Sequence, residues 1–133
     1  MIGETNLSKL LAGMSPKLHP GDYVFVTCDA PDRVPRKETI AEIKEAEGTT
    51  LILERAKADE LGLRYHFIAS WITLIIHSSL DAVGLTAAFS SELAKHGISC
   101  NVVAGYYHDH LFVSKKDAER AIEVLTLLSE QNR

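Results

Sequence analysis

The sequence of 133 residues lacks several features that would point to common classes of protein. No run approaches 18 apolar residues, so no helix is expected to span a membrane, and the first residues do not resemble a secretory signal. The two cysteines, Cys28 and Cys100, have no CxxC spacing, and we interpret them as free buried thiols of a cytoplasmic protein. The net charge is −4, without a concentrated basic face, which argues against nucleic acid as a partner.

Enzyme signatures are also missing. The sequence contains no nucleophile elbow, P-loop or dinucleotide fingerprint. The triplet His77-Ser78-Ser79 suggests a hydrolase, but adjacent residues on a strand point to opposite faces, so His77 is poorly placed to act as a base for Ser78. We therefore expect a non-catalytic protein without a cofactor, and we keep a small enzyme as the alternative.

What is present predicts a folded α+β protein. Apolar residues make up 46% of the chain and charged residues 24%, as in globular domains. Residues 38–48 are predicted to contain one or two helical turns that end at Gly48. The other predicted helices are near 7–13, 56–61, 85–96 and 118–128, and the predicted strands are near 23–28, 49–55, 65–77, 98–107 and 110–114.

Three features indicate two related units. The run 65–77 would span about 43 Å at roughly 3.3 Å per residue, so it either breaks near Ser70 or serves two units as one strand. The apolar placement of "LILERAKADEL" from Leu51 recurs 60 residues later in "LFVSKKDAERA" from Leu111, with Ala58 and Ala118 in register. No strand is predicted after the last helix, so that sheet edge is either filled by a strand from the first unit or left open.

The segment "SSLDAVGLTAAFSSELAKHGISCNVVAG" resembles the signature of the ACT domain. There a strand leads into D/N-x-P-G-x-L, followed by an amphipathic helix and a "GI-N/S" start of the next strand. Val83 stands where proline is usual, which makes the loop less rigid. Residues about 71–128, with "AVGLTAA" and "CNVVAGYYHDHLFV", are similar to small stand-alone bacterial tandem-ACT proteins of poorly defined function. The residues that fall on the family pattern are Asp81, Gly84, Leu85, Gly97, Ile98 and Ser99.

The resemblance implies a ferredoxin-like fold of the βαββαβ type with two tandem ACT-like units. Residues 1–63 would form a divergent first unit and residues 64–133 the ACT domain. Such domains bind amino acids or similar small ligands, usually regulate another activity, and often act across a dimer interface. The expected function is thus non-catalytic, regulatory binding of an amino acid, with no nucleic-acid or membrane partner. A homodimer is expected because the predicted strand "ISCNVVAGYY" carries no charge that would protect a sheet edge.

The corner before the helix at 85–96 is the predicted ligand site. Gly84 lies at the helix start, where free N–H groups and the helix dipole favour a carboxylate, and Asp81 could accept hydrogen bonds from an ammonium group. Alternatively, Asp81 is only a helix cap and Gly84 only a packing residue. If φ of Gly84 is negative, Gly84→Ala should keep or raise the melting temperature and weaken ligand binding. With Ser99 and Asn101 beside this corner or a partner's, the predicted ligand-binding residues are Ser79, Asp81, Val83, Gly84, Leu85, Ser99, Asn101 and His110.

The histidines of "YYHDHLFV" form a second candidate feature. His108 and His110 alternate, so they could face one side of a hairpin, with Asp109 between them. Together with His77 they could bind Zn²⁺ or act as a base, which is the alternative function: a small metal-dependent or His-based enzyme. The spacing matches no known metal signature. A turn role for His108 and Asp109 with His110 packing at a strand start, or a histidine lining the small-molecule pocket, are the other interpretations.

Overall fold

The structure is a computed structural model that describes residues 6–76 and 82–133. The chain divides into two compact units. Unit 1 contains the described residues up to His19 and from Ser70 onward, and unit 2 contains Pro20–Ala69. Each unit combines strands with helices, so the predicted α+β, ferredoxin-like class is confirmed.

Unit 1 has strand order β1–β5–β7–β6. The order is that of a ferredoxin-like βαββαβ unit whose closing strand comes from the start of the chain instead of its end. The 3₁₀ turn Lys115–Asp117 leads into the last helix. The helices and strands are α1 (Leu7–Ala12), β1 (Ser15–Leu18), β5 (Ile68–Ile75), α3 (Leu85–Lys95), β6 (Asn101–Ala104), β7 (Asp109–Ser114) and α4 (Ala118–Gln131).

Strand β1 fills the sheet edge that the sequence left open after the last helix. It pairs antiparallel with β5, with Ser15 opposite Ile75 and Leu18 opposite Ile72. The first of the two alternatives, a strand supplied from the first half of the chain, is therefore confirmed. At the other end of the order, β6 pairs with β7 alone among the described strands, so its prediction as an edge strand is also confirmed.

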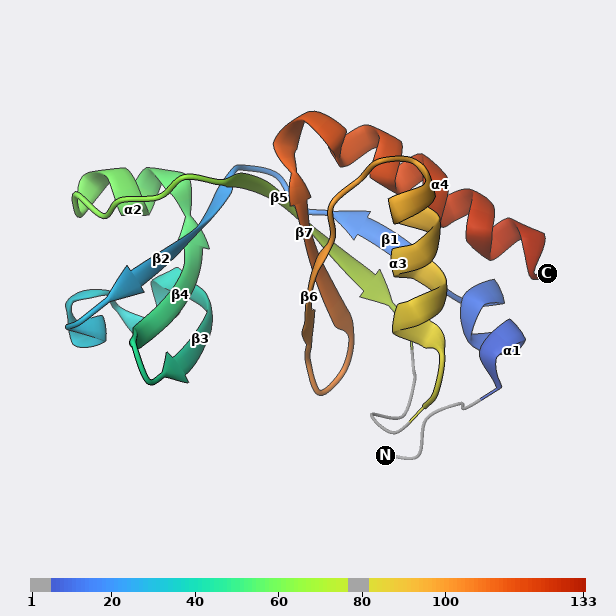
Figure 1. The fold of residues 1–133 in the computed structure, drawn as a ribbon, viewed down its shortest axis with the longest axis horizontal. Coiled ribbons are helices and arrows are strands. Elements are labelled where there is room, and N and C mark those ends of the chain that lie inside the picture. Colours follow the sequence, from blue (N-terminus) through green and yellow to red (C-terminus); the bar gives the residue numbers. More distant parts are fainter. Residues whose placement is uncertain (1–5, 77–81) are drawn as a thin grey trace. The chain divides into compact units, whose positions relative to one another are not determined.

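The core of unit 1 lies between one face of its strands and the helices α1, α3 and α4, which all lie on that side (Figure 1). Alternate residues of each strand point into this core, as the period of two requires. The fully buried side chains of this core include Ile72 and Leu74 of β5, Leu111 and Val113 of β7, Phe89 and Leu93 of α3, and Leu125 of α4. The other face of β5 and β7 therefore carries the residues between them in sequence, including Trp71, Thr73, His110 and Phe112.

Unit 2 has strand order β3–β4–β2, followed by the first residues of β5. Its elements are β2 (Tyr23–Cys28), 3₁₀ turns at Pro31–Arg33 and Arg36–Glu38, β3 (Thr39–Glu45), β4 (Gly48–Glu54) and α2 (Arg55–Glu60). Its core includes Val24, Val26, Leu51, Leu53 and Ala58. Ile68 and Ala69 pair with β2, and β5 continues into unit 1, so one strand serves both units, as one of the two predicted alternatives stated.

The prediction of helical turns in residues 38–48 is wrong, because Thr39–Glu45 forms strand β3. The strand pairs antiparallel with β4, with Glu45 opposite Gly48, so Ala46 and Glu47 form a two-residue hairpin turn. Gly48 has a φ of +154°, and a Cβ there would lie 2.8 Å from Thr27 Oγ1. The close contact with β2 explains the glycine, which ends no helix but begins β4.

Other sequence predictions are confirmed. The predicted helix near 7–13 is α1, which Asn6 caps by accepting a hydrogen bond from Lys9 N at 3.1 Å. The repeat at Leu51 and Leu111 corresponds to two strand–helix pairs, β4–α2 and β7–α4, in which Ala58 and Ala118 are both buried. Both cysteines are free thiols, as predicted; Cys28 is buried, whereas Cys100 is only half-buried. In the parts of the chain that the structure describes, no helix is long and apolar enough to cross a membrane.

Candidate functional site

The predicted corner lies at the start of α3. Gly84 has φ +95° and ψ −11°, in the left-handed region, and the first hydrogen bond of the helix runs from Ala88 N to Gly84 O at 2.9 Å. The backbone N–H groups of Leu85, Thr86 and Ala87 therefore have no acceptor within the helix. Because the macrodipole is positive at this end, the corner offers donors to an anionic group such as a carboxylate.

The residues around Gly84 differ in what they can contribute. Val83 is 84% exposed, whereas the side chain of Leu85 is buried in the core, so only the backbone N–H of Leu85 can meet a ligand. A Cβ on Gly84 would lie 3.4 Å from Leu7 Cδ2 of α1, which is ordinary van der Waals contact. Ser79 and Asp81, which are predicted to bind the ligand, lie outside the described residues, and so does His77.

Ser99 and Asn101 lie at the other end of α3. The helix has 11 residues, which at about 1.5 Å per residue separates its two ends by roughly 16 Å. Ser99 follows the C-terminal end, and Asn101 donates from Nδ2 to Phe112 O at 3.2 Å at the start of β6. Within one chain these two residues are thus far from Gly84, which leaves the corner of a partner as the remaining expected position.

The hairpin between β6 and β7 brings His108 to the C-terminal end of β5, and His110 to the middle of that strand. His108 Nδ1 lies 3.3 Å from Ile76 N and 3.2 Å from Ile76 O, immediately before the predicted corner. Tyr106 and Tyr107 at the hairpin turn are 64% and 65% exposed, and their rings meet edge to face at 5.0 Å. The hairpin therefore places His108 at the end of the strand that leads to α3, and carries two exposed aromatic rings at its own turn.

His110 belongs to a hydrogen-bonded cluster on the sheet face opposite the helices. Trp71 Nε1 donates to His110 Nδ1 at 3.1 Å, and Thr73 Oγ1 lies 3.1 Å from the same nitrogen. Thr73 Oγ1 also lies 2.7 Å from His19 Nε2, and the His19 ring stacks on Trp71 with centroids 3.6 Å apart. His19 N donates to Trp71 O at 2.9 Å, so the cluster ties the end of β1 to β5.

The cluster fixes the protonation of its histidines. An indole N–H can only donate, so Nδ1 of His110 is an acceptor and its proton lies on Nε2. Burial, and then the neighbouring His108, lower the pKa of His110, although Asp109 raises it. Burial, followed by Lys17 and His110, lowers the pKa of His19. The geometry makes the His110 ring neutral, and the lowered pKa values of both histidines favour neutral rings on this face, beside the aromatic ring of Trp71.

The metal-binding alternative has no support in this cluster. Among the described residues, which exclude His77, no group of three or more His, Cys, Asp or Glu side chains could hold a metal ion. His110 Nδ1 is occupied by Trp71, and the pKa of Asp109 is raised by burial, against the opposing effect of the two histidines. The geometry matches the interpretation in which His108 belongs to the hairpin turn and His110 packs at the start of β7. A role of either histidine in a small-molecule site stays a prediction.

Family models match nearly the whole chain. One ACT domain model matches residues 2–70, and a second ACT domain model matches residues 67–126. The chain belongs to the ACT domain family. The tandem arrangement predicted from the internal repeat is confirmed, whereas the predicted boundary between residues 63 and 64 stays a prediction. A comparison with curated proteins gave no match.

Several solved structures share the fold of this chain. A Vibrio cholerae protein of unknown function, described as a possible transport protein, is 48% identical, with a TM-score of 0.81 over 92% of this chain and 95% of that chain. A protein from Agrobacterium tumefaciens is 18% identical, with a TM-score of 0.70 over 87% and 89% of the two chains. The regulatory subunit of aspartate kinase from Thermus thermophilus is 8% identical, with a TM-score of 0.60 over 85% and 95%, and shares the fold.

Sequence reasoning missed most of the polar cluster on the sheet face. Trp71 is 39 residues from His110, and Thr73 is 54 residues from His19, so no local pattern connects them. One signal was available, because the alternation of Trp71 and Thr73 with buried Ile72 and Leu74 indicates a second, polar face of the strand. Nothing in the segment around His19 indicates that its ring would cover Trp71.

Proposed function

We propose that this ACT protein is a non-catalytic regulator that binds a free amino acid at the corner between β5 and α3. The observation that carries the proposal is the start of α3, where Gly84 exposes three backbone N–H groups without intrahelical acceptors. These groups suit the carboxylate of the ligand. Asp81, from the family pattern, would accept the ammonium group, and Ser79 would lie beside it. The membership of the family supports regulatory binding of a small molecule.

Neighbouring residues give the proposed site its remaining walls. Val83 is exposed at the loop and would contact the ligand side chain. His108 approaches the end of β5 from the β6–β7 hairpin, through its ring contact with Ile76. His110 lies farther back along β5, beside Trp71 and Thr73, and would support the site from there. The fold similarity to a regulatory subunit of aspartate kinase supports the regulatory role, and we place the protein in the cytoplasm.

A homodimer would complete the site with residues that one chain cannot supply. β6 is an uncharged edge strand that pairs with β7 alone among the described strands. If two β6 edges pair antiparallel, the Asn101 end of one strand lies beside the Ala104 end of the other, and so beside the partner's hairpin. Ser99 and Asn101 would then approach the corner of the second copy. Light scattering should give about twice the 14.7 kDa chain mass.

A thermal-shift screen against the common amino acids tests the proposal. An amino acid at 100 times its Kd should add about 2.7 kcal/mol to the free energy of unfolding. Asp81→Ala should abolish that gain, while loss of a helix cap alone would cost about 0.5–2 kcal/mol of stability without removing the response. If no amino acid shifts the melting temperature, or if Asp81→Ala keeps the full response, the site is not an amino-acid site.

A further inference from the structure

The two related units differ at the point where the chain leaves β5 in unit 1 and β2 in unit 2. β5 leads to α3, whereas β2 leads to two 3₁₀ turns, and residues 29–38 contain no α-helix. The sequences that follow the two strands are still related, because "DAPD" from Asp29 matches "DAVG" from Asp81. In unit 2, Asp32 therefore stands at the position that Gly84 has in unit 1.

The exchange of glycine for aspartate goes with a different backbone. Gly84 begins α3 in the left-handed region, at φ +95°, and among the described residues only glycines have a positive φ. Asp32 lies inside the first 3₁₀ turn, in which Arg33 N donates to Ala30 O at 3.0 Å. The left-handed start that opens the corner of unit 1 is therefore missing in unit 2.

The 3₁₀ turn offers few hydrogen-bond donors to a carboxylate. The start of α3 has three successive backbone N–H groups, those of residues 85–87, without intrahelical acceptors. In the turn Pro31–Arg33, the proline has no N–H and the N–H of Arg33 is used, so that of Asp32 remains. Because Asp32 carries a carboxylate of its own, it would repel the carboxylate of an amino acid.

The core of unit 2 is closed at this loop. Val34, which follows the first 3₁₀ turn, is 4% exposed and packs with Val24 and Val26. This one side chain covers the strands of unit 2, whereas α3 contributes three buried side chains to the core of unit 1. Rearranging the loop around a ligand would expose an apolar side chain that is now buried, which opposes binding.

The hairpin of unit 2 also lacks the side chain that approaches the corner in unit 1. Residues 105–108 connect β6 to β7, and His108 contacts Ile76 at the end of β5. In unit 2 only Ala46 and Glu47 connect β3 to β4. The short β3–β4 hairpin therefore has no equivalent of His108.

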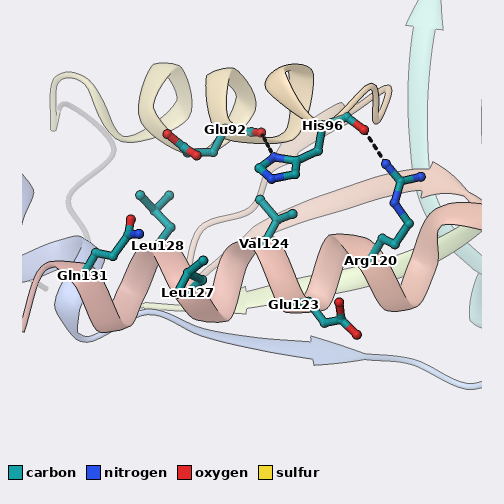
Figure 2. Close-up of a pocket in the computed structure, with 8 residues that line it drawn as sticks. All are labelled: Glu92, His96, Arg120, Glu123, Val124, Leu127, Leu128 and Gln131. Carbon is teal, nitrogen blue, oxygen red and sulfur yellow. Dashed lines mark hydrogen bonds between the residues drawn. The ribbon is translucent and has the colours of Figure 1, made fainter.

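A groove between α3 and α4 does not add an amino-acid site to unit 1. Arg120 Nη1 pairs with Asp117 Oδ1 at 2.9 Å, and the other terminal nitrogen of Arg120 donates to His96 O (Figure 2). With this guanidinium bound, the groove offers no free cation to a carboxylate, and the exposed carboxylate of Glu123 would repel one. The groove has a volume of about 450 Å³ and is lined by Glu92, His96, Arg120, Glu123, Val124, Leu127, Leu128 and Gln131.

We propose that each chain carries a single amino-acid site, at the corner of unit 1, and that unit 2 is a related unit whose corner does not bind a ligand. This inference rests on the proposed function, because it counts sites of that kind. With one site, a single chain responds to its amino acid without cooperativity. Cooperativity then requires coupling between the two chains of a dimer.

The test uses the whole ¹⁵N-labelled chain and the common amino acids, each added alone. An amino acid that binds should shift the amide signals of residues 85–87 in a saturable way, and calorimetry with it should give one bound molecule per chain. Asp29→Ala, at an exposed position, should leave the Kd within about twofold of that of the unmodified chain. The matched variant Asp81→Ala should abolish binding.

The possible results separate this inference from the proposed function. Two bound molecules per chain, or saturable shifts of residues 29–34 that persist in Asp81→Ala, would overturn the single site and leave amino-acid binding established. Loss of binding in Asp29→Ala, with an unchanged circular dichroism spectrum, would overturn it as well. If none of the amino acids binds, the proposed function fails and the single site fails with it.

Discussion

Replacing Gly84 by alanine tests the backbone conformation on which the proposed amino-acid site depends. The expectation that alanine would stabilise the protein required a negative φ, and the observed φ of +95° removes that condition. An alanine in the left-handed region costs roughly 1–2 kcal/mol. The added Cβ would lie 3.4 Å from Leu7 Cδ2, a contact that adds no large steric cost. Gly84→Ala should therefore lower the melting temperature by roughly 3–10 °C.

Gly97 provides a matched control at the opposite end of the same helix. Its φ is +72°, and no heavy atom lies within 4 Å of the Cβ position, so Gly97→Ala carries the same type of backbone strain without a contact. Both variants should lose similar stability in urea or thermal denaturation. Only Gly84→Ala should lose the amino-acid response, because only it alters the backbone N–H groups that face the ligand.

Two outcomes would refute this reasoning. If Gly84→Ala matches or exceeds the stability of the unmodified chain while Gly97→Ala is destabilised, the left-handed conformation at Gly84 is not required. If both variants are destabilised equally and both keep the full shift with an amino acid, the conformation is correct but the ligand does not contact this corner.

Three further predictions concern other parts of the protein. The pKa values of His19 and His110 are lowered from 6.5 in the folded state, so the stability that the two rings contribute is complete above pH 6.5 and is lost as pH falls through the lowered values. The midpoint of urea denaturation should therefore decrease from pH 7.5 to pH 5.5. A midpoint that does not change with pH would contradict the neutral cluster. Phe89→Ala in the core should cost about 3–5 kcal/mol in urea denaturation followed by circular dichroism, and a loss below 1 kcal/mol would contradict its full burial. Ala104→Lys, on the exposed end of β6, should convert a dimer to a monomer in light scattering without loss of folding, and an unchanged mass would place the dimer contact elsewhere.

Helices and strands could be predicted from the sequence where their end signals or their apolar alternation were clear. α3 begins after Gly84 and is followed by Gly97, and β2 alternates apolar residues over the predicted range. β3 was misread because its Glu, Lys and Ala residues favour helices, and Ile40 and Ile43 have helical spacing. Pairing with β4 and the two-residue turn before Gly48 override that local preference.

The local sequence does not predict strand β1. The sequence "SPKL" contains no β-branched or aromatic residue, and proline cannot donate to a ladder. Pro16 is tolerated because β1 has no strand on its outer side in unit 1, and its partner is Leu74, far along the chain. Only the global argument that a βαββα unit needs a closing strand pointed to it.

The candidate site was predictable in part. The glycine at the start of α3 and the two histidines of the hairpin were visible as patterns, whereas the partners of His110 were not, since Trp71 and Thr73 come from β5, far away in the sequence. The groove between α3 and α4 depends on how two helices pack. Some residues that line it, such as Glu92 and Glu123, look like ordinary solvent-exposed positions in the sequence.

The bond from His19 N to Trp71 O has a consequence for how this chain can be divided. It joins the last residue of unit 1 before unit 2 to the second residue after it, so residues 20–69 are an insertion whose two ends are already held together at 2.9 Å. We expect that a short hairpin turn in place of 20–69 would leave β1 and β5 paired and would yield a minimal single ACT module. A fragment that starts at residue 64 would instead lose β1 and expose the edge of β5 to aggregation.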